Sequence, residues 1–157
     1  MGKEIERKFL VNPGAWTPQG PGVHFQQGYL SSLKERVVRV RIEGTIAKLT
    51  VKGPNRGATR SEFEYPLPLT DAVVLLDELC ERPLIDKHRH LERVAGRTWE
   101  IDVFHGDNEG LVVAEVELPA EDSVLELPSW AGEEVTGDPR YYNSNLLQQP
   151  YRTWRTA

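Results

Sequence analysis

Charged and apolar residues alternate along most of residues 3–119, and this alternation limits what the chain can fold into. In a β-strand, residues two apart share a face, so each such segment predicts a strand with one charged and one apolar face. Turn residues such as Gly44-Thr45 and Ala95-Gly96 separate neighbouring segments, as hairpin connections do. The pattern predicts eight strands, near residues 3–11, 24–31, 36–44, 46–53, 59–67, 84–94, 97–106 and 110–119.

One segment changes from the strand period to a helical one. Residues 70–80 place apolar side chains at helical spacing, and Thr70 or Asp71 can cap the start of that helix. A second short helix is expected after Pro119, and another in the tail from Gly132. The helices are few, so they are expected outside a structure that the strands dominate.

Length and composition narrow the class of protein. A chain of 157 residues suits a single domain over residues 1–157, and the elements predict a mostly β (α+β) fold, an antiparallel barrel or sandwich with a few outer helices. The net charge of −5, from 19 Lys and Arg against 24 Asp and Glu, argues against a broad nucleic-acid surface. Cys80 is the one cysteine, and no apolar run is long enough to span a bilayer. We therefore expect a soluble cytoplasmic protein that binds neither nucleic acid nor membrane, and these features leave both a monomer and a homodimer open.

The charged faces repeat like-charged pairs two residues apart, which solvated faces seldom do because neighbouring like charges repel. One interpretation is an ordinary sheet with one solvated face. The other is a closed barrel whose charged face lines a water-filled lumen, which persists only with a bound ligand and metal or with acids paired to bases. The like-charged pairs are Glu4/Glu6, Arg39/Arg41, Glu62/Glu64, Lys87/Arg89, Glu100/Asp102 and Glu115/Glu117.

The residue types on these faces indicate a ligand class. Guanidinium and ammonium groups bind polyphosphate oxygens, and clustered carboxylates bind a hard divalent cation such as Mg²⁺ or Mn²⁺. From the pattern alone, a metal–polyphosphate site and a solvated sheet both stay open. The inward-facing set would comprise the bases Lys8, Arg39, Arg41, Lys52, Lys87 and Arg89, and the acids Glu4, Glu6, Glu62, Glu64, Glu100, Asp102, Glu115 and Glu117.

An ordered series of short motifs carries a resemblance to a known family. The segment Glu4-Ile5-Glu6-Arg7-Lys8 has the pattern E-x-E-x-K, and further landmarks follow it over nearly the whole chain. With this series the sequence resembles the CYTH superfamily, the triphosphate tunnel metalloenzymes, and most of all its short bacterial inorganic triphosphatases. The other landmarks are Gln27-Gly28-Tyr29-Leu30, Arg39-Val40-Arg41, Leu49-Thr50-Val51-Lys52, Glu62-Phe63-Glu64, Lys87-His88-Arg89, Glu100-Ile101-Asp102-Val103-Phe104, Glu115-Val116-Glu117, Glu133-Glu134-Val135-Thr136 and Arg140-Tyr141.

The resemblance implies a closed eight-stranded antiparallel barrel with a charged interior. It also implies metal-dependent hydrolysis of inorganic tripolyphosphate to diphosphate and phosphate, with Mg²⁺ or Mn²⁺. Lys8 and Tyr29 match a pair that assists catalysis in some members. The matching metal ligands are Glu4, Glu6, Asp102, Glu115 and Glu117, and the matching phosphate-binding residues are Lys8, Arg39, Arg41, Lys52, Lys87, Arg89 and, in the segment that helps to close the tunnel, Arg140.

Other functions stay open at this point. Within the family they are thiamine triphosphatase and class IV adenylyl cyclase; outside enzymes, the alternative is a non-catalytic module that binds polyphosphate or nucleotide. The complete carboxylate set favours an enzyme, because anion binding alone does not need it. His88 and His90 share a strand face that is polar and expected to be exposed, and they lack a third ligand for zinc.

Overall fold

The computed structural model describes residues 3–147 and 149–154, with side chains from Ile5 onward. In this part of the chain the backbone forms strands close to all the predicted ranges, and one further strand that the sequence pattern did not indicate, β9. The strands are β1 (Lys3–Val11), β2 (Val23–Leu33), β3 (Arg36–Glu43), β4 (Ile46–Lys52), β5 (Thr59–Leu67), β6 (Ile85–Val94), β7 (Arg97–Phe104), β8 (Val112–Glu117) and β9 (Ala131–Glu134).

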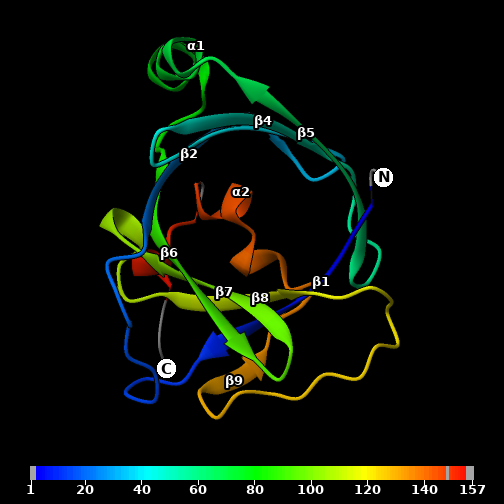
Figure 1. Cartoon of the computed structure of the whole chain (residues 1–157). Helices are drawn as coiled ribbons and strands as arrows, with labels where there is room; N and C mark the ends of the chain where they lie inside the picture. The colour runs from blue at the N-terminus through cyan, green and yellow to red at the C-terminus, as the bar shows by residue number, and fades with distance from the viewer. Residues whose placement is uncertain (1–2, 148, 155–157) are drawn as a thin grey trace.

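Eight of the strands close into an antiparallel barrel (Figure 1). The order is β5-β4-β3-β2-β6-β7-β8-β1, and the ring closes because the start of β1 pairs with β5. The middle of β1 pairs with β8 and its end with β9. The barrel prediction is confirmed, and the open, solvated sheet is wrong.

The predicted helix near residues 70–80 forms, but it starts one residue early. It consists of α1 (Leu69–Val74) and the π-helix η1 (Leu75–Leu79), and Pro68 stands at the cap without a side-chain hydrogen bond. The predicted cap at Thr70 or Asp71 is therefore wrong. This helix lies outside the ring in Figure 1 and covers β3 and β4 through a buried cluster. The cluster comprises Val40, Ala47, Ala72, Leu76 and Cys80.

The helix predicted after Pro119 does not form. Residues 119–130 run as turns and irregular chain over the outer face of β1, β7 and β8, where Leu118 and Trp130 pack with Trp99. An extended segment covers that apolar face more widely than a short helix would.

The tail from Gly132 starts within β9 and then turns helical as predicted. Its helices are η3 (Pro139–Tyr141), α2 (Asn143–Leu146) and η4 (Tyr151–Thr153), and η2 (Gly106–Asn108) lies in the β7–β8 turn.

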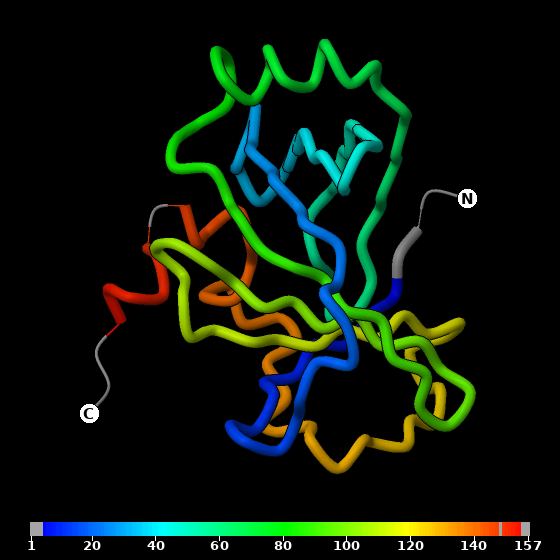
Figure 2. The backbone as a smooth tube through the Cα atoms, turned by 60° about the vertical axis from the view of Figure 1, so that its left-hand side comes forward, coloured from blue at the N-terminus to red at the C-terminus, as the bar shows by residue number. Residues whose placement is uncertain are grey.

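The C-terminal segment fills one end of the lumen. In Figure 1, α2 lies inside the ring of strands, and Tyr141, Leu146 and Leu147 pack there against apolar side chains of the barrel. In Figure 2 the chain beyond α2 lies beside the β7–β8 turn, where the Tyr151 N–H donates to the Asn108 side chain. None of the helices in residues 3–147 and 149–154 has the length and apolar character to cross a membrane.

Candidate active site

The lumen holds a cavity of about 840 Å³, lined by side chains from every strand of the ring. At one end it reaches the surface beside Val23, Ile46 and Leu91, which are 47%, 59% and 66% exposed. At the other end Tyr142 and Asn143 line it, with the apolar contacts of the C-terminal segment behind them. The cavity is therefore a cup that opens at one end of the barrel.

Buried bases from β3 and β6 form one part of the cavity wall. Arg39, Arg41 and Lys87 are 7%, 6% and 0% exposed, and the Arg89 side chain is 11% exposed. The ring of Phe25, on the intervening strand β2, lies 4.8 Å from the guanidinium carbons of both Arg41 and Arg89. Such contacts hold cations over an aromatic face and keep the two guanidinium groups in place.

Asp102 lies behind these bases. Its carboxylate accepts from Lys87 Nζ at 2.7 Å and from Arg89 Nε and Nη2 at 2.7 and 2.8 Å. Burial opposes its charge, but Arg89 and Lys87 hold the pKa of Asp102 well below its usual range. With 1% exposure, the side chain orients two bases and does not line the cavity.

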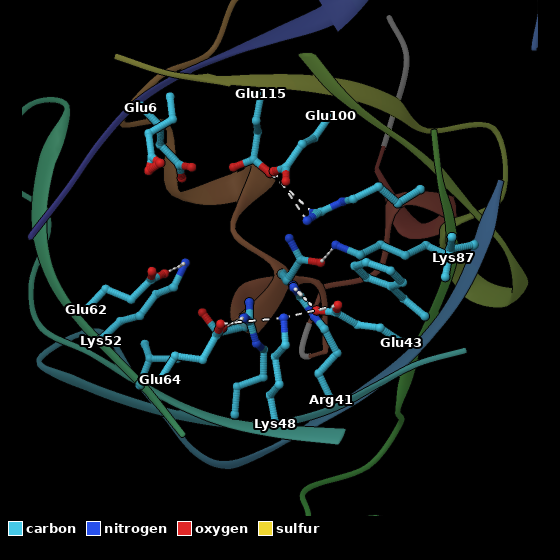
Figure 3. A pocket seen from close by; sticks show the side chains of 18 of the residues that line it. Glu6, Arg41, Glu43, Lys48, Lys52, Glu62, Glu64, Lys87, Glu100 and Glu115 are labelled. Carbon is cyan, nitrogen blue, oxygen red and sulfur yellow. Dashed lines mark hydrogen bonds and ion pairs between the residues drawn. The ribbon is translucent and has the colours of Figure 1, made fainter. Parts of the chain in front are cut away.

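Carboxylates from β1, β7 and β8 gather on the wall opposite β3 and β4 (Figure 3). Across neighbouring strands Glu6 faces Glu117, and Glu100 faces Glu115. Like charges directly opposite each other are destabilising. Accordingly, burial and then the neighbouring carboxylates raise the pKa of Glu100 despite Arg89. A bound cation would offset this repulsion.

Two lysines at the site have opposite electrostatic surroundings. Lys8 Nζ donates to the Tyr141 carbonyl at 3.1 Å and lies 3.8 Å from Glu115. Burial opposes its charge, but Glu115 and Glu6 outweigh that effect and raise the pKa of Lys8. Burial, Arg89 and Arg41 lower the pKa of Lys87 to about 7, despite the adjacent Asp102.

The β3–β5 wall pairs its own charges. Glu43 accepts from Arg41 Nη1 and from Lys48 Nζ, both at 3.3 Å, and Lys48 Nζ also lies 3.6 Å from Glu64 (Figure 3). Lys52 pairs with Glu62 at 3.3 Å. Acids and bases thus meet inside the barrel, as a charged lumen requires.

Comparison with known sequences decides the family. The sequence profile of the CYTH domain matches residues 2–145. The chain belongs to the CYTH domain family. It is 49% identical over 155 residues to an inorganic triphosphatase of Acetivibrio thermocellus, covering 99% of each chain. It is also 37% identical over 149 residues to an inorganic triphosphatase of Nitrosomonas europaea, covering 91% of this chain and 95% of that protein. A solved structure of an inorganic triphosphatase superposes with a TM-score of 0.65 at 35% identity, over 92% of this chain and 97% of that one.

Most of the predicted site residues meet in this CYTH cavity. Arg140 does not: its side chain is 61% exposed and pairs with Asp138 at 2.8 Å. The Glu4 side chain lies outside the described residues. Tyr29 lines the cavity but accepts a hydrogen bond from Gln27, whereas Lys8 contacts Tyr141 and Glu115. The predicted residues that line the cavity are Glu6, Lys8, Tyr29, Arg39, Arg41, Lys52, Lys87, Arg89, Glu115 and Glu117.

Sequence reasoning missed two contributors to the CYTH site, Phe25 and Asn143, and left a third, Glu43, undecided. Phe25 shares the inward face with Gln27 and Tyr29 at i, i+2 and i+4, and that spacing is the signal that could have found it. Glu43 shares the charged face of Arg39 and Arg41, which left an internal pair and a rim charge both open, and its contacts with Arg41 and Lys48 make it an internal pair. Asn143 had no signal, because nothing local marks a residue 56 positions from its partner Lys87.

The histidines lie on the outer wall. His24 and His88 stack with ring centroids 4.9 Å apart, and His88 Nδ1 lies 2.7 Å from His105 Nε2. His24 also pairs with the half-exposed Asp86. Across the described residues, no three His, Cys, Asp or Glu side chains are placed to hold a metal ion, so zinc at His88 and His90 gains no support.

Proposed function

We propose that the protein is an inorganic triphosphatase that hydrolyses a terminal phosphoanhydride bond of tripolyphosphate to give diphosphate and phosphate. The observation that carries this proposal is the cavity in which buried bases on one wall face carboxylates on the other. The two bacterial relatives with that name, 49% and 37% identical, support it.

The bases suit a polyanion of this size. Arg39 and Arg41 can hold non-bridging oxygens with two N–H groups each, and Lys52 and Lys87 contribute point charges. Asp102 fixes Lys87 and Arg89 before the substrate arrives, so little side-chain ordering is left to oppose binding. We propose this orienting role for Asp102, although the family resemblance assigns it to the metal.

The carboxylate wall fits a divalent cation, for which we propose Mg²⁺ or Mn²⁺. Glu6, Glu115 and Glu117 would hold it, with Glu4, and their repulsion across neighbouring strands would be relieved. Mg²⁺ binds one or two carboxylates directly and completes its shell with water and phosphate oxygens, so the other carboxylates of this wall would contact the water ligands of the ion. Such an ion supplies Lewis-acid stabilisation of phosphate oxygens when bound.

The chain's own residues then perform the hydrolysis. Water adds to the terminal phosphorus, the bridging P–O bond breaks, and negative charge develops on the departing diphosphate. Arg39, Arg41 and Arg89 stabilise that charge from fixed positions, which is the main demand of phosphoryl transfer. Lys8, kept protonated by Glu115 and Glu6, supplies a fixed positive charge to the departing phosphate oxygens, and we propose Tyr29, which lines the same cavity, as its partner.

We further propose that residues 1–157 act as a single domain, a monomer or homodimer, on free polyphosphate in the cytoplasm, without nucleic acid or membrane. The net charge of −5 supports a small anion drawn into a local basic cavity, as opposed to a broad anionic surface.

The test is phosphate release from tripolyphosphate, ATP and thiamine triphosphate, with Mg²⁺, with Mn²⁺ and with EDTA. We expect fast release from tripolyphosphate with metal, slow or no release from ATP, and none with EDTA. Lys8→Ala and Glu6→Ala should each lower kcat/KM by about 100-fold or more. Lys34→Ala, exposed and outside the cavity, is the control and should retain full activity.

Three other outcomes would overturn parts of the proposal, provided that circular dichroism shows the variants to be folded. Equal rates with EDTA would rule out the metal. Binding of tripolyphosphate without release would replace the enzyme by a binding module. Full activity in Tyr29→Phe would remove the Lys8–Tyr29 pair.

A further inference from the structure

We propose that Asn143 and Gln27 are positioning residues, which join the C-terminal segment to the phosphate-binding bases so that docking of α2 completes the site. This inference rests on the proposed function, because it assigns Lys87 and Arg41 to the substrate. Neither amide was assigned a role by the sequence motifs, and Asn143 comes from the opposite end of the chain to Gln27.

Gln27 is a buried junction with every part of its amide in use. It is 0% exposed, and its Oε1 accepts from Arg41 Nε at 2.8 Å. Its Nε2 donates to the Tyr29 hydroxyl at 3.0 Å and to Asn143 Oδ1 at 3.2 Å. One side chain therefore fixes both a phosphate-binding guanidinium and the tyrosine, and its own orientation depends on Asn143.

Asn143 fixes the remaining base. Its Oδ1 accepts from Lys87 Nζ at 2.9 Å in addition to Gln27. An ammonium group has three N–H donors. Asp102 and Asn143 take two of them within the described residues, so the third can point into the cavity that Lys87 lines. Without Asn143, the ammonium could rotate about its bond to Cε and aim elsewhere.

The same short segment also holds Lys8. The Tyr141 carbonyl accepts from Lys8 Nζ, so the chain from Tyr141 to Asn143 contacts bases from β1 and β6. Tyr141, Leu146 and Leu147 anchor this segment in the apolar end of the lumen. Because the anchors and the polar contacts alternate within seven residues (141–147), docking of the segment and placement of both lysines are one event.

The alternative is that Asn143 merely satisfies buried donors and matters only for stability. Asn145 provides the matched control. It lies in the same helix and donates from Nδ2 to the Pro139 carbonyl at 2.7 Å, but it does not line the cavity. Asn145→Ala removes a hydrogen bond from the same segment without touching a base.

The experiment measures tripolyphosphate affinity by calorimetry in EDTA, kcat and KM with metal, and stability in urea. Asn143→Ala and Asn143→Leu, which keeps the branched shape and the number of heavy atoms, should both weaken tripolyphosphate binding and lower kcat/KM by about tenfold, the size expected for one buried hydrogen bond to a charged group. Asn145→Ala should change both by less than about twofold. Agreement between the alanine and leucine variants ties the effect to the lost oxygen and not to a void.

A double-mutant cycle supplies the decisive readout. In a Lys87→Met background, Asn143→Ala should weaken tripolyphosphate binding by a clearly smaller factor, because its main partner is gone. An undiminished effect in that background would overturn the proposal, as would wild-type affinity and kinetics in a less stable Asn143→Ala. If the wild type binds tripolyphosphate without hydrolysing it, the proposed function fails while the calorimetric cycle still tests the positioning role.

Discussion

The two ends of one lumen are built from the same strands and differ completely in chemistry. Toward the open end, the inward positions carry charge. Two residues away on five of the strands, toward the other end of the lumen, the same face carries an apolar side chain that packs on the C-terminal segment. Strand alternation therefore sets only the direction of a side chain, and its surroundings depend on what meets that face. The pairs are Lys8 and Leu10, Arg39 and Val37, Lys87 and Ile85, Asp102 and Phe104, and Glu115 and Val113.

The two ends of the lumen contribute to different properties: the apolar end to folding stability, and the charged end to ligand binding. The apolar end removes Leu146, Leu147 and Tyr141 from water, which favours folding. At the charged end, burial of Lys87 and Arg89 is unfavourable and is offset by Asp102. We infer that the apolar end stabilises the barrel while the charged end keeps bases poised for an anion.

Removing the carboxylate that neutralises the buried bases at the charged end should cause the largest loss of folding stability. Asp102→Ala leaves Lys87 and Arg89 buried without their shared carboxylate. We expect the free energy of unfolding to fall by about 4 kcal/mol. Urea denaturation of the metal-free protein measures it. Glu100→Gln, two residues earlier and 42% exposed in its side chain, is the control and should lose less than about 1 kcal/mol. A metal-free Asp102→Ala as stable as wild type would show that Asp102 serves only a metal.

Truncating a leucine at the apolar end should cause the next largest loss of folding stability. Leu146 is 0% exposed, so Leu146→Ala should lower the free energy of unfolding by about 3 kcal/mol through lost burial and a void. Leu33→Ala, at a position that is 53% exposed, should stay within about 0.5 kcal/mol of wild type. Equal losses for the two leucines would mean that the C-terminal segment does not stabilise the barrel.

The smallest expected effect is a change in the loss of stability at acid pH, and it concerns Glu43 on the β3–β5 wall. Burial raises the pKa of Glu43, but Arg41 and Lys48 outweigh it, so the folded value lies below the ordinary 4.5. A lowered acid pKa contributes stability that is present above the unfolded value and is lost as pH falls through the folded one. Glu43→Gln should therefore lose less stability than wild type between about pH 5 and pH 3, by under about 1 kcal/mol. Urea denaturation across that pH range is the measurement, and parallel curves would contradict it.

The sequence predicted what local periodicity controls. The eight strands, their hairpins and the charged faces that carry Arg39 and Glu115 follow from alternation, whereas the family resemblance was needed to predict that these faces point inward. Local periodicity could not predict contacts between residues far apart in the sequence, such as the hydrogen bond from Lys8 Nζ to the Tyr141 carbonyl. The helix expected after Pro119 failed for the same reason: the outer face around Trp99 decides that segment, and local propensity does not. Arg140 shows that a motif position does not by itself place a side chain in the cavity.

The placement of β1 has a consequence for synthesis on the ribosome. β1 is translated before its neighbours β5, β8 and β9, which end only at Leu67, Glu117 and Glu134. The nascent chain must carry an edge with unmatched N–H and C=O groups until the last of these neighbours has emerged. Such an edge readily joins another chain, so slow or stalled translation should favour aggregation through β1.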